Sequence, residues 1–258
     1  MPHAVFITGT DTGVGKTVVT AALCRCLARR GWSVGVMKPI ETGIPSPAAA
    51  VSDAVHLRDA SETESELALI RPYWFRTPVA PLTAARLAKK RIVIDRIIAA
   101  FHVLCRQHAL LLVEGVGGVH VPLTDSQDVL DLIKALHVAT IVVGRSKLGG
   151  INHARLTIEA LHKRHIRVLA LVLSRTEQSG RTESRQERST VTLLREFAQV
   201  PVIGPIPYDK NLNQDWNTAV KRLSFTAAIE DLADVLVGSL PADRARLSLR
   251  PPLPGRLR

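Results

Sequence analysis

A short apolar run, followed at once by a glycine-rich loop and a helical pattern, constrains this chain more than any other feature of its sequence. Residues 5–8 are Val-Phe-Ile-Thr, residues 9–17 are Gly-Thr-Asp-Thr-Gly-Val-Gly-Lys-Thr, and the helical pattern begins at Lys16. A strand, a glycine-rich loop and a helix in this order form a phosphate-binding P-loop. The glycines let backbone N–H groups converge on phosphate oxygens, and the first amides of the helix add partial positive charge. We therefore expect Lys16 to bridge the β- and γ-phosphates of a nucleoside triphosphate, and the Thr17 hydroxyl to bind Mg²⁺.

The loop departs in one respect from the general P-loop pattern. Five residues separate Gly9 from Gly15, one more than the general pattern has between its outer glycines. The alternative interpretation is a glycine-rich turn that merely joins a strand to a helix. Because Gly-Lys-Thr stands at the start of the helix and a buried strand precedes the loop, a nucleotide site is the favoured interpretation.

Short β-branched runs alternate with helical patterns along the rest of the chain, which favours βα units and a mainly parallel sheet. The runs are nearly continuous in apolar residues, as expected for strands covered by helices on both faces. We therefore predict a single doubly wound, P-loop NTPase-like α/β domain over residues 1–240. The expected strands are residues 5–8, 34–37, 110–113, 139–143, 168–173 and 202–203, and the expected helices are residues 16–30, 93–108, 126–137, 152–165, 188–199 and 225–237.

Basic residues are concentrated near the end of the chain. The net charge is +11, and residues 244–258 contain five arginines and no acidic residue. We predict that residues 241–258 form a mobile basic tail, and that the polar segment 176–190 is also solvated rather than part of the core. Such a tail could contact nucleic acid. No aromatic residues accompany its charge, however, so nucleic-acid binding is not favoured.

Composition excludes several other classes of protein. Hydrophobic residues make up 46% of the chain, which is enough to form a core and excludes extensive disorder. Three cysteines are too few for a disulfide framework or a thiolate zinc site. No apolar run approaches the roughly 18 residues that span a bilayer, and the first residues show no cleavage signature. We therefore expect a cytoplasmic protein without a membrane partner.

Polar residues follow two of the predicted strands. Lys38 follows the strand 34–37, and Glu114 follows the strand 110–113. The carboxyl ends of parallel strands border the ligand crevice of such sheets, so Lys38 is predicted to point into it, although a solvated lysine remains the alternative. An acidic residue beside a P-loop is suited to bind Mg²⁺ or to position water. Asp53 opens a weakly helical stretch, where a helix cap is the alternative role.

These segments together resemble the dethiobiotin synthetase family, ATP-dependent carboxylases of biotin biosynthesis. They lie in family order between residues 8 and 207, and the longer P-loop spacing is usual in that family. The matching segments are Gly9-Thr10-Asp11-Thr12, Val14-Gly15-Lys16-Thr17, Lys38-Pro39, Thr42-Gly43, Ser52-Asp53-Ala54, Val113-Glu114-Gly115 and Lys147-Leu148-Gly149-Gly150-Ile151-Asn152-His153-Ala154.

The resemblance implies a reaction and a set of site residues. CO2 or bicarbonate would carboxylate one amine of 7,8-diaminononanoate, ATP would phosphorylate the carbamate, and the second amine would close a cyclic urea. Lys38 and Lys16 would be catalytic, Thr17, Asp53 and Glu114 would hold Mg²⁺ directly or through water, and the substrate would contact Lys38, Thr42, Gly149, Gly150 and Asn152. The nucleotide, ATP or another triphosphate, would contact Thr12, Gly13, Val14, Gly15, Lys16, Thr17, Val18, Glu114, Gly115, Gly117, Ser174 and Pro207.

The resemblance also implies a homodimer. It places Gly149, Gly150 and Asn152 at a two-fold interface, where the free amides at the N-terminus of the following helix would hold the substrate carboxylate for the neighbouring subunit. On the residues alone, an ordinary helix cap is the alternative role for Asn152.

Two positions differ from the family pattern. Gly13 stands where some members carry glutamate. Ser174 occupies the position of a family asparagine that contacts the purine base, and a hydroxyl cannot make the paired donor and acceptor contacts of an amide. Selectivity for adenine is therefore not predicted. Pro207 lies in a segment, residues 206–208, that resembles the family segment bordering the base. A turn at the end of a strand is the alternative interpretation.

Two other classes of nucleotide-dependent protein are alternatives to this family. A dimeric chromosome-partition ATPase that binds DNA would suit the positive charge, but such motors carry a second lysine early in the P-loop, where this chain has Asp11. An amide synthase of the cobalamin kind usually carries a glutamine-hydrolysing domain, for which this chain has neither the length nor a suitable Cys and His.

Overall fold

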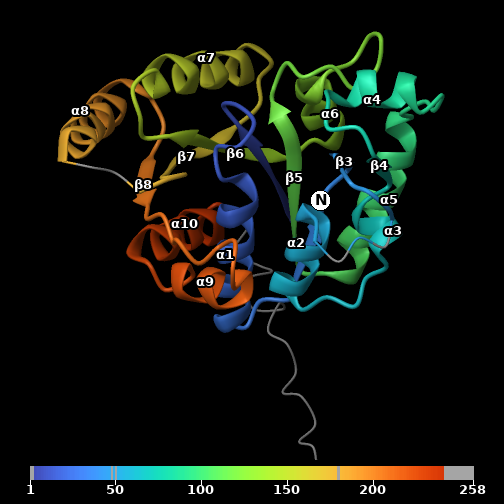
Figure 1. Ribbon diagram of the computed structural model, residues 1–258, viewed down its shortest axis with the longest axis horizontal. Helices are drawn as coiled ribbons and strands as arrows, with labels where there is room; N and C mark the ends of the chain where they lie inside the picture. Colours follow the sequence, from blue (N-terminus) through green and yellow to red (C-terminus); the bar gives the residue numbers. More distant parts are fainter. Residues whose placement is uncertain (1–2, 48, 50, 179–180, 241–258) are drawn as a thin grey trace, which may run out of the picture.

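The computed structural model describes residues 3–47, 49, 51–178 and 181–240, and within these residues a six-stranded sheet forms the centre of the molecule (Figure 1). Its strand order is β2-β5-β1-β6-β7-β8, and all neighbouring strands are parallel. The predicted parallel sheet is therefore confirmed. Its strands are β1 (Ala4–Gly9), β2 (Val34–Met37), β5 (Leu110–Gly118), β6 (Ala139–Arg145), β7 (Val168–Ser174) and β8 (Val202–Ile206).

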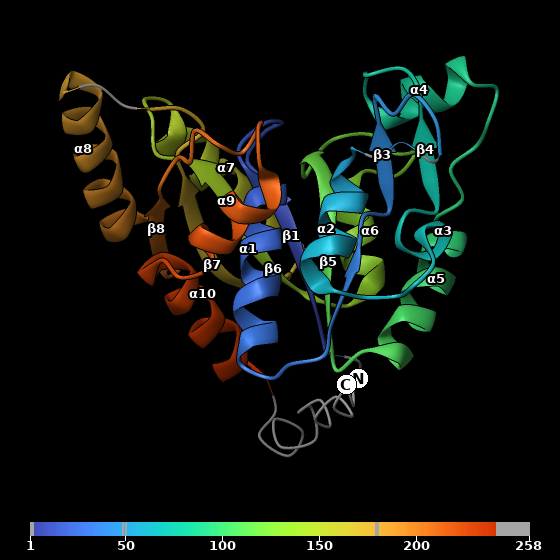
Figure 2. The same ribbon diagram turned by 60° about the horizontal axis from the view of Figure 1, so that its bottom comes forward.

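Helices cover both faces of this sheet, which confirms the doubly wound arrangement (Figure 2). Successive side chains of a strand point to opposite faces: Phe6 packs into one buried cluster, whereas Val5 and Ile7 pack into the other. The cluster around Phe6 contains α5 (Ile94–Gln107), α6 (Val129–Leu136), α7 (Gly150–Lys163) and α8 (Arg181–Phe197). The opposite cluster contains α1 (Lys16–Arg29), α2 (Asp53–Ser61), α9 (Trp216–Leu223) and α10 (Ala227–Gly238).

A smaller parallel sheet, absent from the sequence prediction, lies beside the main one (Figure 2). It pairs β3 (Ile40–Thr42) with β4 (Tyr73–Phe75), and it is accompanied by the short helices α3 (Leu67–Ile70) and α4 (Pro81–Leu87). Runs of three residues are too short to show a strand period, so the sequence gives no signal for them. Because β3 follows β2 after only Lys38 and Pro39, this small sheet forms one wall of the crevice above β2.

The prediction that the segment 176–190 is solvated is wrong for the second half of that segment. Helix α8 begins at Arg181, and the Glu187 side chain is buried against Arg175 and Ser146. The Arg175 Nε lies 2.9 Å from Glu187 Oε2. This ion pair offsets the cost of burying the charge, and hydrophobic periodicity cannot detect such a contact. The predicted tail, residues 241–258, lies outside the described residues.

The other predicted helices begin and end close to their predicted bounds, whereas α9 (Trp216–Leu223) was not predicted. The largest difference is at α6, which begins at Val129 rather than at residue 126. Asp128 accepts a hydrogen bond from the backbone N–H of Asp131, whose own side chain accepts from the Asp128 backbone. This reciprocal cap fixes the first turn of the helix. No described helix has both the length and the apolar character that crossing a membrane would require.

Candidate functional site

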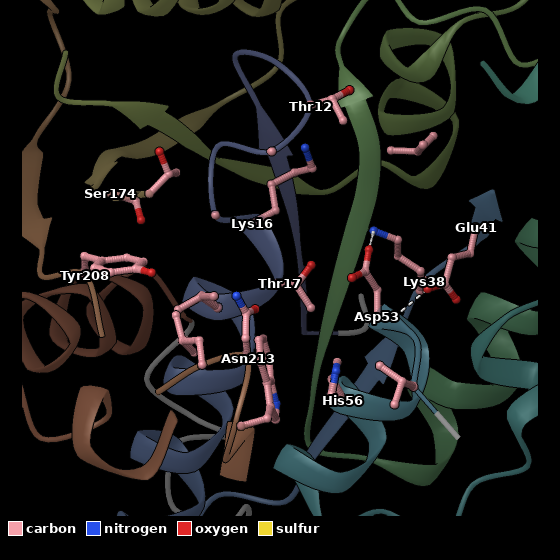
Figure 3. A pocket seen from close by; sticks show the side chains of 18 of the residues that line it. Thr12, Lys16, Thr17, Lys38, Glu41, Asp53, His56, Ser174, Tyr208 and Asn213 are labelled. Atoms are coloured by element: carbon pink, nitrogen blue, oxygen red, sulfur yellow. Dashed lines mark hydrogen bonds and ion pairs between the residues drawn. The ribbon is translucent and has the colours of Figure 1, made fainter. Parts of the chain in front are cut away.

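A cleft of about 770 Å³ opens at the carboxyl ends of β1 and β2, above the start of α1 (Figure 3). The glycine-rich loop lines its centre, and Lys38, Thr42 and Asp53 line one side. The other side is formed by the end of β7 and by the segment from Pro207 to Trp216. The cleft thus lies where parallel α/β sheets bind ligands.

The loop between β1 and α1 has the shape that its glycines permit. Gly13 and Gly15 have φ angles of 69° and 95°, a region that disfavours side chains. At Gly9 a Cβ atom would lie 2.7 Å from the Asp11 carbonyl oxygen and 2.8 Å from Lys16 Nζ. The chain therefore curls tightly around the Lys16 ammonium, which donates a hydrogen bond of 2.9 Å to Asp11 O.

The Lys16 ammonium is poorly solvated. Burial, and to a smaller extent the charge of Lys38, lowers the pKa of Lys16 to about 8, although the carboxylates of Glu114, Asp53 and Asp11 act in the opposite direction. A polyphosphate placed beside Lys16 would favour the charged form. Binding of such a ligand is therefore coupled to the protonation of Lys16.

We expect nucleotide affinity to fall as the pH rises through about 8, the Lys16 pKa of the ligand-free protein. Above that pH the free protein has lost the Lys16 proton, and a triphosphate must recover it on binding. Calorimetric titration at about pH 9, in two buffers of different ionisation enthalpy, should show net proton uptake. A Lys16→Arg variant is the control, because arginine stays charged at that pH and should take up no proton. Equal heats in the two buffers for the unmodified protein would contradict this expectation.

Four predicted side chains meet on the α2 side of the loop. Lys38 Nζ lies 2.6 Å from Glu114 Oε1 and 2.8 Å from Asp53 Oδ2. The Thr17 hydroxyl donates to the same Glu114 oxygen over 2.8 Å. Glu114 is fully buried and Lys38 is 3% exposed, so the ion pair is shielded from water. The structure thus brings together residues that the sequence places 97 positions apart.

The charges in this cluster stabilise one another. Burial by itself lowers the pKa of Lys38, but Asp53 and Glu114 more than compensate and hold that pKa above its usual range. Burial would raise the pKa of Asp53, but the neighbouring Lys38 keeps it below its usual value. Lys38 is therefore an ammonium and Asp53 a carboxylate at neutral pH.

The oxygen atoms of this cluster suit a small, hard cation. Mg²⁺ prefers oxygen ligands and usually binds through one or two carboxylates together with substrate phosphates. Glu114 Oε2 is buried and has no hydrogen-bond partner among the described residues, as expected for an atom that a cation would satisfy. No group of three or more His, Cys, Asp or Glu able to hold a metal occurs in the described part of the chain. Of Thr17, Asp53 and Glu114, only two are carboxylates. These three residues therefore fit an ion that phosphate oxygens also bind.

Most of the predicted nucleotide-binding residues line the cleft. Ser174 lies against the loop, where a Cβ on Gly15 would come within 2.7 Å of its Oγ. Three predicted residues lie behind the lining, among them Val14, which is fully buried. The residues that line the cleft are Thr12, Gly13, Gly15, Lys16, Thr17, Val18, Gly117, Ser174 and Pro207, and those behind the lining are Val14, Glu114 and Gly115.

The predicted substrate-binding residues divide into two groups. Lys38 and Thr42 line the cleft. Gly149, Gly150 and Asn152 lie at the start of α7 and do not line it. Gly149 has a φ of 87°, and at Gly150 a Cβ would lie 2.3 Å from the Arg145 carbonyl oxygen, so both positions require glycine.

The structure adds residues that the sequence analysis missed. His56 stacks on Trp216, with ring centroids 4.1 Å apart, and joins α2 to α9 across the bottom of the cleft. The Arg145 guanidinium donates to the Thr12 carbonyl oxygen over 3.0 Å and supports the loop from the β6 side. The sequence offers a signal for His56 alone, which lies three residues after Asp53 on the same helix face.

The parallel sheet, the glycine-rich loop and the lysine within it define a P-loop nucleotide-binding protein. A family model described as an AAA domain matches residues 3–215. Among solved structures, the MinC:MinD cell division complex of Aquifex aeolicus matches with a TM-score of 0.56 and 16% identity, over 93% of this chain and 98% of the other. A ParA family ATPase from Chlorobium tepidum matches with a TM-score of 0.52 and 13% identity, over 90% of this chain and 99% of the other. At such identities these structures show a shared fold.

Sequence relatives narrow the class. The ATP-dependent dethiobiotin synthetase of Thermodesulfovibrio yellowstonii is 40% identical over 240 residues, which cover 89% of this chain and 99% of that protein. The ATP-dependent dethiobiotin synthetase of Methanococcus vannielii is 35% identical over 221 residues, which cover 86% and 99%. The chain belongs to the dethiobiotin synthetase family, as its motifs predict.

Proposed function

We propose that this protein carboxylates 7,8-diaminononanoate with CO2 or bicarbonate and closes the product to dethiobiotin, with ATP and Mg²⁺ bound at the cleft. The protein is an ATP-dependent dethiobiotin synthetase, a ligase. The observation that carries the proposed chemistry is the buried ammonium of Lys38, held by Asp53 and Glu114 beside the P-loop. The cytoplasm, which supplies ATP, is the compartment that we propose.

The reaction gathers negative charge in one place, because a carbamate must approach a triphosphate before phosphoryl transfer. Lys16 would bind the phosphates, and Lys38 would lie against the carbamate, so that preorganised positive charge offsets the repulsion. Mg²⁺, held by Thr17, Asp53 and Glu114, would neutralise charge on the phosphate oxygens. The carbamate oxygen then displaces ADP from the γ-phosphorus. The second amine attacks the carbamoyl carbon, releases phosphate and forms the cyclic urea.

We further propose that the protein acts as a homodimer whose interface includes the start of α7. Gly149, Gly150 and Asn152 lie outside the cleft of their own chain, as expected of residues that serve a neighbouring subunit. Leu148 and Leu156, on the same segment, are 83% and 56% exposed. Burial of these side chains against a second copy would favour association. The free amides of the helix N-terminus would then hold the substrate carboxylate.

A phosphate-release assay tests the proposed function. Purified protein would be supplied with 7,8-diaminononanoate, bicarbonate, Mg²⁺ and ATP, and release should require the diamine. The fold also suits a partition-type dimeric ATPase that binds DNA. Release that ignores the diamine and increases on addition of DNA would favour that alternative and overturn the proposed reaction.

We expect weak selectivity for the nucleotide base, because Ser174 cannot pair with a purine edge as an amide does. The values of kcat/KM for CTP and GTP should lie within about tenfold of the value for ATP, since one hydrogen bond has a net worth of roughly 0.5–1.5 kcal/mol. A Ser174→Asn variant should widen the preference for ATP, and the KM for the diamine is the internal control. A strong preference for ATP in the unmodified protein would show that another group contacts the base.

A further inference from the structure

We infer that Glu41 and Arg71 form a positioning pair, which holds Asp53 in place and so sets the affinity of the site for Mg²⁺. Neither residue is among the predicted catalytic or binding residues, and the proposed role acts through Asp53. The inference rests on the proposed function, because it takes Asp53 to be a metal ligand.

The pair is buried at the edge of the cleft. The side chains of Arg71 and Glu41 are 2% and 5% exposed, and Arg71 Nη1 lies 2.9 Å from Glu41 Oε2. Glu41 lies in β3, and Arg71 immediately follows α3 and precedes β4. Since β3 and β4 are hydrogen-bonded neighbours, the small sheet fixes where the two charges meet.

Both partners also hold the start of helix α2. The second oxygen of Glu41, Oε1, accepts a hydrogen bond of 2.5 Å from the backbone N–H of Asp53, the first residue of the helix. Arg71 donates to the hydroxyl of the helix cap, Ser52, over 3.0 Å and to the Pro47 carbonyl oxygen over 2.8 Å. A carboxylate at a helix N-terminus also interacts favourably with the helix dipole. The start of α2 is therefore tied to two other elements by charged groups.

Through Asp53, the Glu41–Arg71 pair is connected to the cluster of Thr17, Lys38 and Glu114. Asp53 uses its backbone to bind Glu41 and its side chain to bind Lys38, 2.8 Å away, and the three residues lie side by side in Figure 3. A shift of the helix start would move the Asp53 carboxylate relative to Thr17 and Glu114. Both Glu41 oxygens already have partners in the protein, so its contribution is to place Asp53 rather than to contact the ion.

A purely stabilising role explains these contacts less well. A buried ion pair adds little stability over apolar residues of similar volume, whereas directional hydrogen bonds to a ligand-bearing helix fix its position. Groups that orient metal ligands in this way typically change metal affinity by about 10- to 100-fold when they are removed. The expected signature is therefore a loss of metal affinity that is separate from any loss of stability.

The experiment measures how much the metal contributes to nucleotide binding. The affinity for a non-hydrolysable ATP analogue would be determined by calorimetry in EDTA and again in excess Mg²⁺, and the ratio of the two affinities reports the metal. The test variant is Glu41→Met with Arg71→Met, which removes both charges and leaves neither one buried alone. We expect the ratio to fall about tenfold while the affinity in EDTA stays unchanged. Arg71→Lys, which keeps the charge but cannot reach all three partners, should lower the ratio less.

Two controls separate the outcomes. Arg30→Met removes an ion-pairing arginine at the far end of α1, where it contacts Glu230 and Asp234, and should leave the ratio unchanged. Asp53→Asn tests the metal assignment itself and should lower the ratio. If Asp53→Asn lowers the ratio while the double variant keeps it, the positioning role is overturned and the metal assignment stands. If Asp53→Asn also keeps the ratio, the metal assignment in the proposed function fails. Should the double variant not fold, an unchanged ratio in Arg71→Lys overturns the inference.

Discussion

A Lys38→Met variant is expected to lose about two to three powers of ten in turnover while it still binds nucleotide. Removal of one preorganised charge from a site that stabilises developing negative charge commonly costs roughly 3–4 kcal/mol in the transition state. Lys38 is 3% exposed and contacts two carboxylates, and methionine brings no charge that could replace its ammonium. Nucleotide binding should persist, because the loop amides and Lys16 remain. Turnover would be measured by diamine-dependent phosphate release, and binding by calorimetry in Mg²⁺.

The control for this variant is Lys134→Ala, which removes an exposed lysine of α6 and should leave turnover unchanged. Without Lys38, two carboxylates face each other with no cation between them, so the Lys38→Met protein should be stabilised by Mg²⁺ more than the unmodified protein is. Thermal unfolding with and without Mg²⁺ measures this difference. Near-normal turnover would remove Lys38 from the mechanism.

The centre of the site follows from local sequence because strand order places the right strand ends together. β1 lies between β5 and β6, and β5 lies between β1 and β2, so the loop after β1, Lys38 after β2 and Glu114 in the middle of β5, which extends beyond the predicted strand to Gly118, lie close together. Each of these residues follows an apolar run in the sequence, and for Glu114 that run, residues 110–113, is the first part of β5. Asp53 is assigned to this group only through the family motif, because the pattern alone leaves a helix cap as the alternative role. In the structure the cap is Ser52.

The supporting contacts could not be predicted in the same way. Glu41 and Arg71 are separated by 30 positions and meet because two three-residue strands pair. Such strands leave no periodic pattern, and an arginine before a strand looks like any exposed charge. The same limit applies to Glu187, whose burial depends on Arg175 and Ser146 from other elements. Polar residues are buried where tertiary partners satisfy them, and local sequence does not show the partner.

Glu114→Gln should have an effect as large as that of Lys38→Met, and it should also lower stability. Glu114 is fully buried, and one of its oxygens accepts from both Thr17 and Lys38. The amide keeps the shape but loses the charge, so Lys38 retains only Asp53 as a carboxylate partner. Breaking a buried ion pair costs about 3–5 kcal/mol. Because Asp53 remains, we expect the lower end of that range, which lowers the unfolding temperature by roughly 10 °C.

Turnover of Glu114→Gln should fall by about two to three powers of ten even well below its unfolding temperature, because the variant loses a predicted metal ligand and weakens the hold on Lys38. The Mg²⁺ concentration for half-maximal rate should rise with it. The matched control is Glu230→Gln, which removes a carboxylate that pairs with Arg29 and Arg30 at the opposite end of α1. That change should lower stability slightly and leave the Mg²⁺ dependence unchanged. A Glu114→Gln protein with the Mg²⁺ dependence of the unmodified enzyme would show that its carboxylate serves the fold and the lysine, and that the metal is held by Thr17, Asp53 and the phosphates alone.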